Sequence, residues 1–153
     1  TEDLNNITDV YSYARKFMAE NGNPTQWGTN YPSEQLIEND INNKKMYVIE
    51  EENQIHAVFM FDICEDETYE VIKNGQWLSD EEYGVIHRVA SDGKIKGVVN
   101  KAVEFCSAKK AQRRIDTHKE NKIRQHQIEK NGFKKCGIIE LLNGDERIAY
   151  EKI

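Results

Sequence analysis

The fold of this chain is decided by the stretch YGVIHRVA-SDGKIKG, which runs from Tyr83 to Gly97. Its first part, Tyr83–Ala90, is an apolar run typical of a buried strand. Its second part, Ser91–Gly97, carries two glycines and two lysines and is typical of a loop. A strongly amphipathic helix pattern follows at once, because apolar residues recur at helical spacing at Ile95, Val98, Val99, Ala102, Val103 and Cys106.

This order of strand, basic glycine loop and helix predicts an anion site. The loop offers free backbone N–H groups at the positive end of a helix dipole. Lys94 and Lys96 add two ammonium groups at the same point. Such a combination suits a phosphate or a pyrophosphate, so we expect a phosphorylated cofactor to bind at this loop.

Two helices are predicted before this stretch, at about Thr8–Asn21 and Ser33–Ile41, with Thr8 and Ser33 placed to cap them. The segment between them, Gly22–Ser33, contains both prolines of the chain and is predicted to be a loop. The apolar face of the first helix is predicted to hold Val10, Tyr13, Ala14, Phe17 and Met18.

Further strands are indicated by β-branched and aromatic runs on both sides of the deciding stretch. Residues 65–82 are acidic and irregular. A helix over Asn121–Asn131, which Asn121 is placed to cap, is predicted to end at Asn131-Gly132. A first hairpin is predicted from strands at Lys45–Glu50 and Gln54–Asp62, joined at Glu51–Asn53. A single strand is predicted at Arg114–His118. A last hairpin is predicted from strands at Phe133–Ile139 and Arg147–Lys152, with its turn at Asn143-Gly144.

Composition limits the class of protein. The 153 residues and 17.8 kDa fit a single domain, residues 1–153, with a real core. The net charge of −6 and the pI near 5.3 argue against nucleic acid as a partner. No apolar run reaches the length of a membrane span and no charged-then-apolar leader is present, so we expect a cytoplasmic protein with no membrane partner.

The three cysteines, Cys64, Cys106 and Cys136, lie far apart and form no CxxC pair. An odd number of widely spaced cysteines is typical of reduced core thiols in a cytosolic protein. We therefore expect neither a disulfide framework nor a zinc site, and no metal ligands are assigned.

The order of these elements resembles the GCN5-related N-acetyltransferase (GNAT) family. In that family an Arg/Gln-x-x-Gly-x-Gly/Ala loop holds the pyrophosphate of acetyl-CoA, and Lys94–Val99 occupies its place here. The helix that begins at Asn121 and closes in Gly132-Phe133 is the second signature. The resemblance covers essentially the whole chain. It implies an α/β (α+β) acyl-CoA acyltransferase fold, in which a mixed, mostly antiparallel sheet has helices on both faces and splayed central strands.

The same resemblance implies the cofactor-binding residues. Lys94 replaces the family's Arg or Gln, and Val99 replaces its last small residue. Backbone amides do most of the holding, so binding of acetyl-CoA as cosubstrate is still expected. Many members carry a tyrosine that protonates the leaving thiolate, where this chain has Ile128. The implied cofactor residues are Val89, Ala90, Ser91, Gly93, Lys94, Ile95, Lys96, Gly97, Val98 and Asn121.

His87 is the predicted catalytic base. In a regular strand it alternates with Val85 and Val89 on one face, close to where the resemblance places the acetyl group. A histidine with a pKa near 6.5 can accept a proton from an amine, directly or through water. The alternative is a hydrogen-bonded core histidine. His118 and His126 are interpreted as structural.

Large aromatic residues in polar segments are candidates for a substrate wall. Trp27 and Tyr31 lie in the loop between the first two helices, where they either line a pocket or pin the loop to the core. Tyr69 and Trp77, in the acidic segment, have the same two interpretations. The carboxylates of that segment, which would attract a cationic amine or simply be solvated, are Glu65, Asp66, Glu67 and Glu70.

The sequence therefore predicts an N-acetyltransferase that moves the acetyl group of acetyl-CoA directly to a primary amine, expected to belong to a small molecule. Two alternatives stay open, namely a CoA-binding module without turnover and an acetyltransferase that acts on a protein amine. The expected partners are acetyl-CoA and the amine acceptor, in a monomer or a homodimer. The sequence contains no GxxxxGK[ST] and no GxGxxG after a strand, so nucleotide hydrolysis and hydride transfer have no support.

Overall fold

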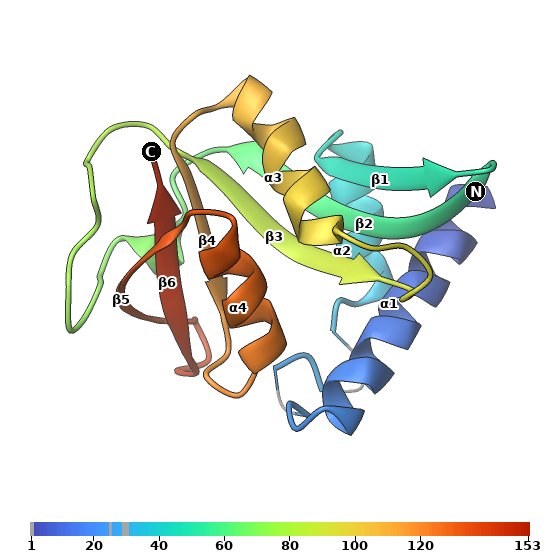
Figure 1. The fold of residues 1–153 in the computed structure, drawn as a ribbon, viewed down its shortest axis with the longest axis horizontal. Helices are drawn as coiled ribbons and strands as arrows, with labels where there is room; N and C mark the ends of the chain where they lie inside the picture. The colour runs from blue at the N-terminus through green and yellow to red at the C-terminus, as the bar shows by residue number, and fades with distance from the viewer. Residues whose placement is uncertain (1, 25, 29–30) are drawn as a thin grey trace. The chain divides into compact units, whose positions relative to one another are not determined.

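A computed structural model describes residues 2–24, 26–28 and 31–153 of the chain (Figure 1). Within these residues the sheet has six strands in the order β1-β2-β3-β4-β6-β5. The chain forms two compact units, the first up to Phe61 with His87–Val98, the second from Asp62 to Ile86 with Val99–Ile153. Strand β3 (Gly84–Ser91) passes from the second unit into the first. The predicted α/β fold with a mixed, mostly antiparallel sheet is confirmed.

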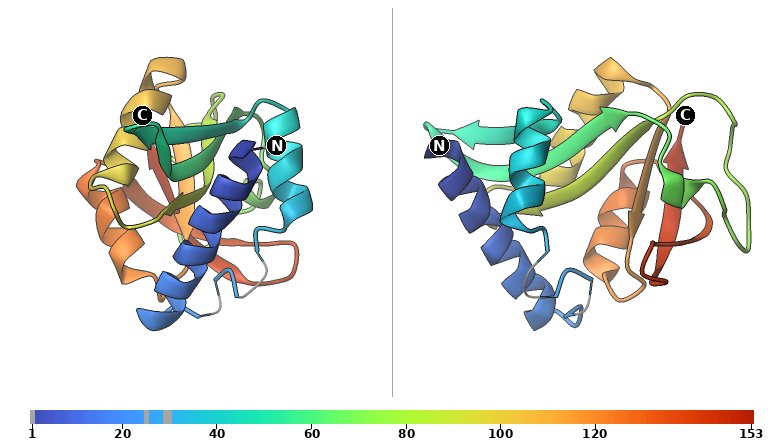
Figure 2. Two further views of the ribbon diagram at one scale, coloured as in Figure 1. Left: turned by 90° about the vertical axis from the view of Figure 1, so that its right-hand side faces the viewer. Right: turned by 180° about the vertical axis from the view of Figure 1, so that it is seen from behind.

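The first unit contains helices α1 (Glu2–Glu20) and α2 (Glu34–Asn42), strand β1 (Met46–Glu51) and most of β2 (Gln54–Ile63). β1 and β2 form the predicted antiparallel hairpin. Its turn holds Glu52 and Asn53 at φ of 53° and 65°, the left-handed geometry that suits a two-residue hairpin turn. Both helices lie on the same side of this hairpin (Figure 2). The Ser33 hydroxyl accepts a hydrogen bond from the Leu36 amide (3.2 Å), which confirms the predicted cap of α2.

Helix α1 differs from its prediction at the start and on the buried face. It begins at Glu2, and the Thr8 hydroxyl donates to the Leu4 carbonyl (2.8 Å) instead of capping. Tyr13 and Phe17 are 45% and 41% exposed, so they do not belong to the buried face. A longer apolar stripe, which begins one turn earlier, faces the core instead and consists of Ile7, Val10, Tyr11, Ala14 and Met18.

The second unit contains the remaining elements. Helix α4 lies in front of β4 in the view of Figure 1. β4 pairs parallel with β3 through Gly84 and Val85, and antiparallel with β6, which also pairs with β5. The bounds are η1 (Glu67–Tyr69), α3 (Val98–Lys109, with Val98 in the first unit), β4 (Arg113–Thr117), α4 (Lys122–Lys130), β5 (Lys134–Glu140) and β6 (Glu146–Lys152).

All three cysteines are free thiols, as predicted. Cys106 and Cys136 are buried and Cys64 is half-buried. Burial raises the pKa of the Cys106 thiol to about 12, so this group stays protonated at neutral pH. Among the described helices, none combines the length and apolar character that crossing a membrane requires.

Within the second unit, a buried ion pair connects the irregular segment before β3 to strands β4 and β6. Arg114 of β4 donates to a carboxylate oxygen of Glu151 on β6 (2.7 Å), and both side chains are nearly inaccessible to solvent. The other Glu151 oxygen accepts from the Leu78 amide (2.7 Å). The Arg114 guanidinium lies over the rings of Trp77 and Tyr83, 3.9 and 3.8 Å from their centroids. The pair therefore holds a segment that has almost no regular secondary structure.

Replacing Glu151 with alanine should lower the free energy of unfolding by about 3–5 kcal/mol, because a buried arginine would lose its counter-charge. The matched control is Glu146→Ala on the same strand, where the side chain is exposed and the expected change is within about 0.5 kcal/mol. Urea unfolding monitored by circular dichroism measures both changes. Equal stability of the two variants would show that Arg114 needs no counter-charge in the folded protein.

Candidate functional site

The loop between β3 and α3 begins with a closed turn. The Ser91 hydroxyl accepts from the Gly93 amide (3.1 Å), and the Asp92 carboxylate accepts from the Lys94 amide (2.9 Å). The Asp92 amide itself donates to the His56 carbonyl on β2 (2.9 Å). Gly93 adopts φ of 78°, a left-handed conformation that favours glycine. Three loop amides, those of Asp92, Gly93 and Lys94, are therefore already used by the protein.

The second half of the loop has amides available to a ligand. Among the residues that the structure describes, no acceptor bonds to the amides of Ile95, Lys96 and Gly97. Gly97 adopts φ of 70°, and a Cβ added there would meet no atom within 4 Å. Helix α3 begins at the next residue, so its positive end points into the same region. This arrangement can bind an anion through the backbone, assisted by the exposed Lys94 and Lys96.

The end of β3 can reach a ligand mainly through its backbone. Val89 and Ala90 are 3% and 1% exposed, so their side chains belong to the core. Ser91 is half-buried and its hydroxyl is bonded within the loop. Among the predicted cofactor residues in the first unit, Ile95, Lys96 and Gly97 are therefore the strongest candidates for direct contact with a ligand, through their backbone amides.

Arg88 interrupts the regular course of β3. Its φ is 52°, and a left-handed residue inside a strand is the geometry of a β-bulge. The Tyr11 hydroxyl donates to the Arg88 carbonyl (2.8 Å). Burial raises the pKa of Tyr11 far above its ordinary value, so the hydroxyl keeps the proton it donates. The expectation that His87 alternates strictly with Val89 along a regular strand is therefore wrong. His87 itself is half-buried, in the residue before the bulge.

The side chain of Arg88 is held by α2. Its Nε and Nη2 donate to the two oxygens of Asp40 (2.8 and 2.9 Å), and the two side chains are 11% and 8% exposed. This is a bidentate, charge-assisted pair. The sequence analysis did not predict this pair. The available signal was the position of Asp40, which lies three residues after the buried Ile37 and therefore on the same face of α2. The pair fixes the strand at the bulge, directly beside His87.

Trp27 and Tyr31 have different environments. Trp27 packs against the core of the first unit, with its ring edge to face with Tyr11 at 5.7 Å between centroids. Tyr31 is 40% exposed, and its hydroxyl accepts a hydrogen bond from Arg88 Nη1 (3.3 Å). Trp27 therefore fixes its loop to the core of the first unit, while the ring of Tyr31 is partly exposed beside the bulge. The neighbouring loop residues 25, 29 and 30 lie outside the described residues.

In the second unit, Tyr69 does not line a substrate pocket. Its ring is 1% exposed and its hydroxyl donates to Asp116 (2.7 Å), so the predicted substrate role is replaced by a core position. Trp77 donates its indole N–H to the Tyr69 carbonyl (2.9 Å), which fixes the same segment. Asp66 accepts from the Thr68 amide and caps η1, while the side chains of Glu65, Glu67 and Glu70 are exposed.

Asn121 and the histidines of the second unit occupy local structural positions. The Asn121 side chain accepts from the Arg124 amide (3.0 Å), which confirms it as the cap of α4. His118 Nδ1 accepts from the Glu120 amide (3.0 Å), and desolvation lowers the pKa of His118. His126 is exposed on α4. Ile128 is 1% exposed, so that helix position supplies packing and no acid.

The whole chain is similar to solved acetyltransferase structures. An acetyltransferase of the GNAT family from Streptococcus agalactiae 2603 is 28% identical, with a TM-score of 0.88 over 99% of this chain and 90% of that chain. A GNAT family acetyltransferase from Listeria monocytogenes 4b F2365 is 17% identical, with a TM-score of 0.68 over 99% and 89%. A ribosomal-protein-alanine N-acetyltransferase from Brucella melitensis is 15% identical, with a TM-score of 0.62 over 99% and 94%. No family model and no curated protein matches the sequence.

Replacing Asp40 with alanine should lower the free energy of unfolding by about 3–5 kcal/mol, because the largely buried Arg88 would lose the carboxylate that pairs with its guanidinium. Asn39→Ala is the matched control, since Asn39 is exposed on the same helix and the expected change is within about 0.5 kcal/mol. Urea unfolding followed by tryptophan fluorescence measures both. An Asp40→Ala variant as stable as the control would show that the bulge needs no ion pair.

Proposed function

We propose that this chain, which belongs by its fold to the GCN5-related N-acetyltransferases, transfers the acetyl group of acetyl-CoA to a primary amine of a small molecule. The observation that carries the proposal is the loop of Ile95, Lys96 and Gly97 at the start of α3. Its uncommitted amides, its two lysines and the helix dipole together suit a diphosphate. The similarity to solved acetyltransferases supports acyl transfer as the reaction class.

The diphosphate is held mainly by backbone groups. This explains why Lys94 and Val99 can differ from the family pattern without loss of binding. Val89 and Ala90 contribute only backbone atoms, since their side chains are buried. Holding the thioester in a fixed orientation is the main contribution of such a site, because a bound and aligned pair reacts as if at very high concentration.

The transfer step requires a neutral amine. The amine nitrogen attacks the thioester carbonyl carbon, a C–N bond forms and the C–S bond breaks. We propose that the imidazole of His87 accepts the proton that the amine loses, directly or through a water molecule. The thiolate leaves as an anion and takes a proton from water, which is tolerable because a thiol pKa is about 8.5. Ile128, being buried and apolar, takes no part in this proton transfer.

A second candidate function is binding of CoA without turnover. The observation that favours it is Ile128, which supplies no proton to a leaving thiolate. Acetylation of a protein amine is the further alternative, and one structural relative is described as acting on a ribosomal-protein alanine. The three functions differ in whether CoA is released and in which acceptor drives that release.

The wild-type protein should release free CoA thiol from acetyl-CoA in the presence of its acceptor, in a thiol assay run against amines, amino acids and peptides. His87→Ala should lower kcat by about 10²-fold, because a positioned base contributes about this factor. His126→Ala, which removes an exposed histidine of α4, should leave kcat unchanged. Release of no thiol with any acceptor would favour the binding module. Full activity of a folded His87→Ala variant would mean that another group accepts the proton.

CoA should stabilise the protein by about 2.7 kcal/mol at 100 times its Kd, seen as a rise in melting temperature. Gly97→Glu should abolish this rise, because it adds bulk and a negative charge where the diphosphate approaches the backbone. Gly22→Glu is the matched control. Gly22 also has a positive φ (83°) and open space around its Cβ position. It lies just after α1 and is not part of the loop that precedes α3. A normal response to CoA in Gly97→Glu would place the diphosphate elsewhere.

A further inference from the structure

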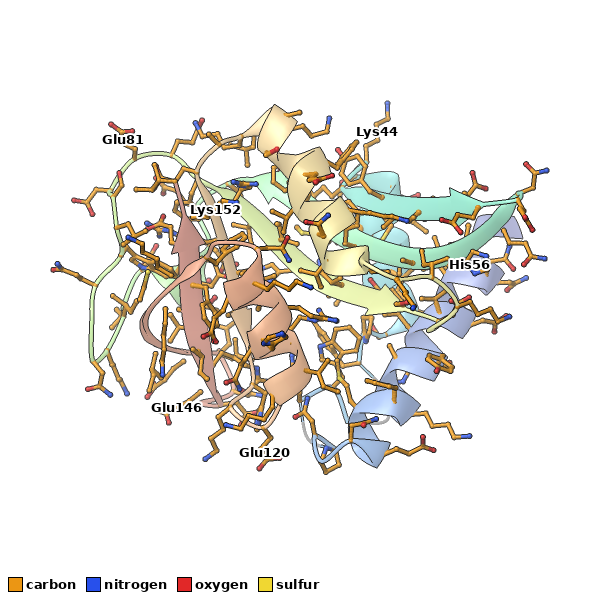
Figure 3. The ribbon with its side chains drawn as sticks, in the orientation of Figure 1. Lys44, His56, Glu81, Glu120, Glu146 and Lys152 are labelled. Carbon is orange, nitrogen blue, oxygen red and sulfur yellow. The ribbon has the colours of Figure 1, made fainter. Side chains whose placement is uncertain are left out.

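The loop that we propose to bind the diphosphate is attached to β2 by one histidine. We propose that His56 is a positioning residue for the phosphorylated cosubstrate, and that it acts by holding Asp92 so that the amides of Ile95–Gly97 stay in place. This inference rests on the proposed function. His56 lies on β2 of the first unit and is labelled in Figure 3.

His56 and Asp92 make two contacts with each other. The ring Nδ1 of His56 lies 2.7 Å from the Asp92 carboxylate, and the Asp92 amide donates to the His56 carbonyl at 2.9 Å. A carboxylate only accepts, so His56 Nδ1 carries the proton of this hydrogen bond. The two side chains are 12% and 16% exposed, which means that water competes little for the contact. Two bonds between the same residues fix both the position and the rotation of Asp92.

The fixed Asp92 determines the rest of the turn. Its second carboxylate oxygen accepts from the Lys94 amide (2.9 Å), so the side chain connects His56 to the backbone two residues further along. On the other side, the turn packs against α1. A Cβ added to Gly93 would lie 2.7 Å from the Tyr13 hydroxyl. The turn is therefore held by β2 and α1 before any ligand arrives.

The same residues border an open cavity of about 360 Å³ in the first unit. Its lining includes Tyr13, His56, Asp92 and Lys94, and also the exposed carboxylate of Asp9. Asp92 belongs to the turn that precedes the diphosphate amides, yet its charge has the wrong sign for a diphosphate. A negative side chain at this position is understandable if its function is to hold the turn. Pairing with His56 gives it that function.

A preorganised loop loses less conformational freedom when it binds, so breaking the attachment should weaken binding of the diphosphate. A structural defect would weaken every part of the ligand equally. CoA and pantetheine separate the two effects, because pantetheine lacks the diphosphate.

Asp92→Ala separates positioning from charge. Loss of the attachment predicts weaker CoA binding, whereas relief of electrostatic repulsion alone predicts tighter CoA binding.

Calorimetric titration of the full chain with CoA and with pantetheine tests the proposal. His56→Ala and Asp92→Ala should each raise the Kd for CoA about tenfold and leave the Kd for pantetheine unchanged. His56→Asn should restore CoA binding to within twofold of wild type, because its amide can donate to Asp92 in place of Nδ1. The matched control Asp9→Ala, which removes an exposed carboxylate from the same cavity, should also stay within twofold.

Several results would overturn the proposal. A His56→Ala variant that binds CoA as wild type does would show that the attachment is dispensable. Tighter CoA binding by Asp92→Ala would show that the carboxylate acts only by repulsion. An equal rise in Kd for CoA and pantetheine would indicate a general structural defect, and failure of His56→Asn to restore binding would exclude the hydrogen bond as the cause. Absence of CoA binding by the wild-type protein would refute the proposed function itself.

Discussion

The left-handed backbone of Arg88 is the constraint on which the first unit depends. A non-glycine residue in this conformation inside a strand is unfavourable by itself, by about 1–3 kcal/mol, and persists only when its surroundings hold it. Here the Tyr11 hydroxyl holds the carbonyl and Asp40 holds the guanidinium. Helices α1 and α2 each contribute one of these two groups, so the contacts that pack the helices also maintain the bulge. The residue before it, His87, takes its position from the same contacts.

The second unit uses a buried arginine in a similar way. Arg114 pairs with Glu151 and lies against Trp77 and Tyr83, which come from a segment with little regular structure. A buried charge pair is weak evidence for net stability, since desolvation offsets much of the attraction. What the structure shows is that one guanidinium contacts the Glu151 carboxylate and both rings, so it joins β4, β6 and the irregular segment at one point. Tyr69, which the sequence suggested for substrate contact, is enclosed by this arrangement.

The candidate site depends on backbone groups more than on side chains. The amides of Ile95, Lys96 and Gly97 remain available because Ser91, Asp92 and His56 satisfy the preceding ones. A diphosphate bound through these amides would place few demands on the side chains of the loop, provided that Gly93 and Gly97 keep their positive φ. The proposed site is therefore compatible with a loop in which Lys94 and Val99 depart from the family pattern.

The sequence by itself determined the order of the elements, the loop at the head of α3 and the caps at Ser33 and Asn121, because these depend on local periodicity and on hydrogen bonds between near neighbours. It also indicated the family, because the helix that begins at Asn121 and closes in Gly132-Phe133 can be recognised within one short stretch of sequence. Only the tertiary structure decided which face of α1 is buried, that Tyr69 belongs to the core, and that Arg88 breaks the alternation around His87. Each of these depends on partners far away in the chain, such as Asp40 for Arg88, Asp116 for Tyr69 and His56 for Asp92. A local pattern carries no information about such contacts, because their free energy arises from burial and pairing that exist only when the chain has folded.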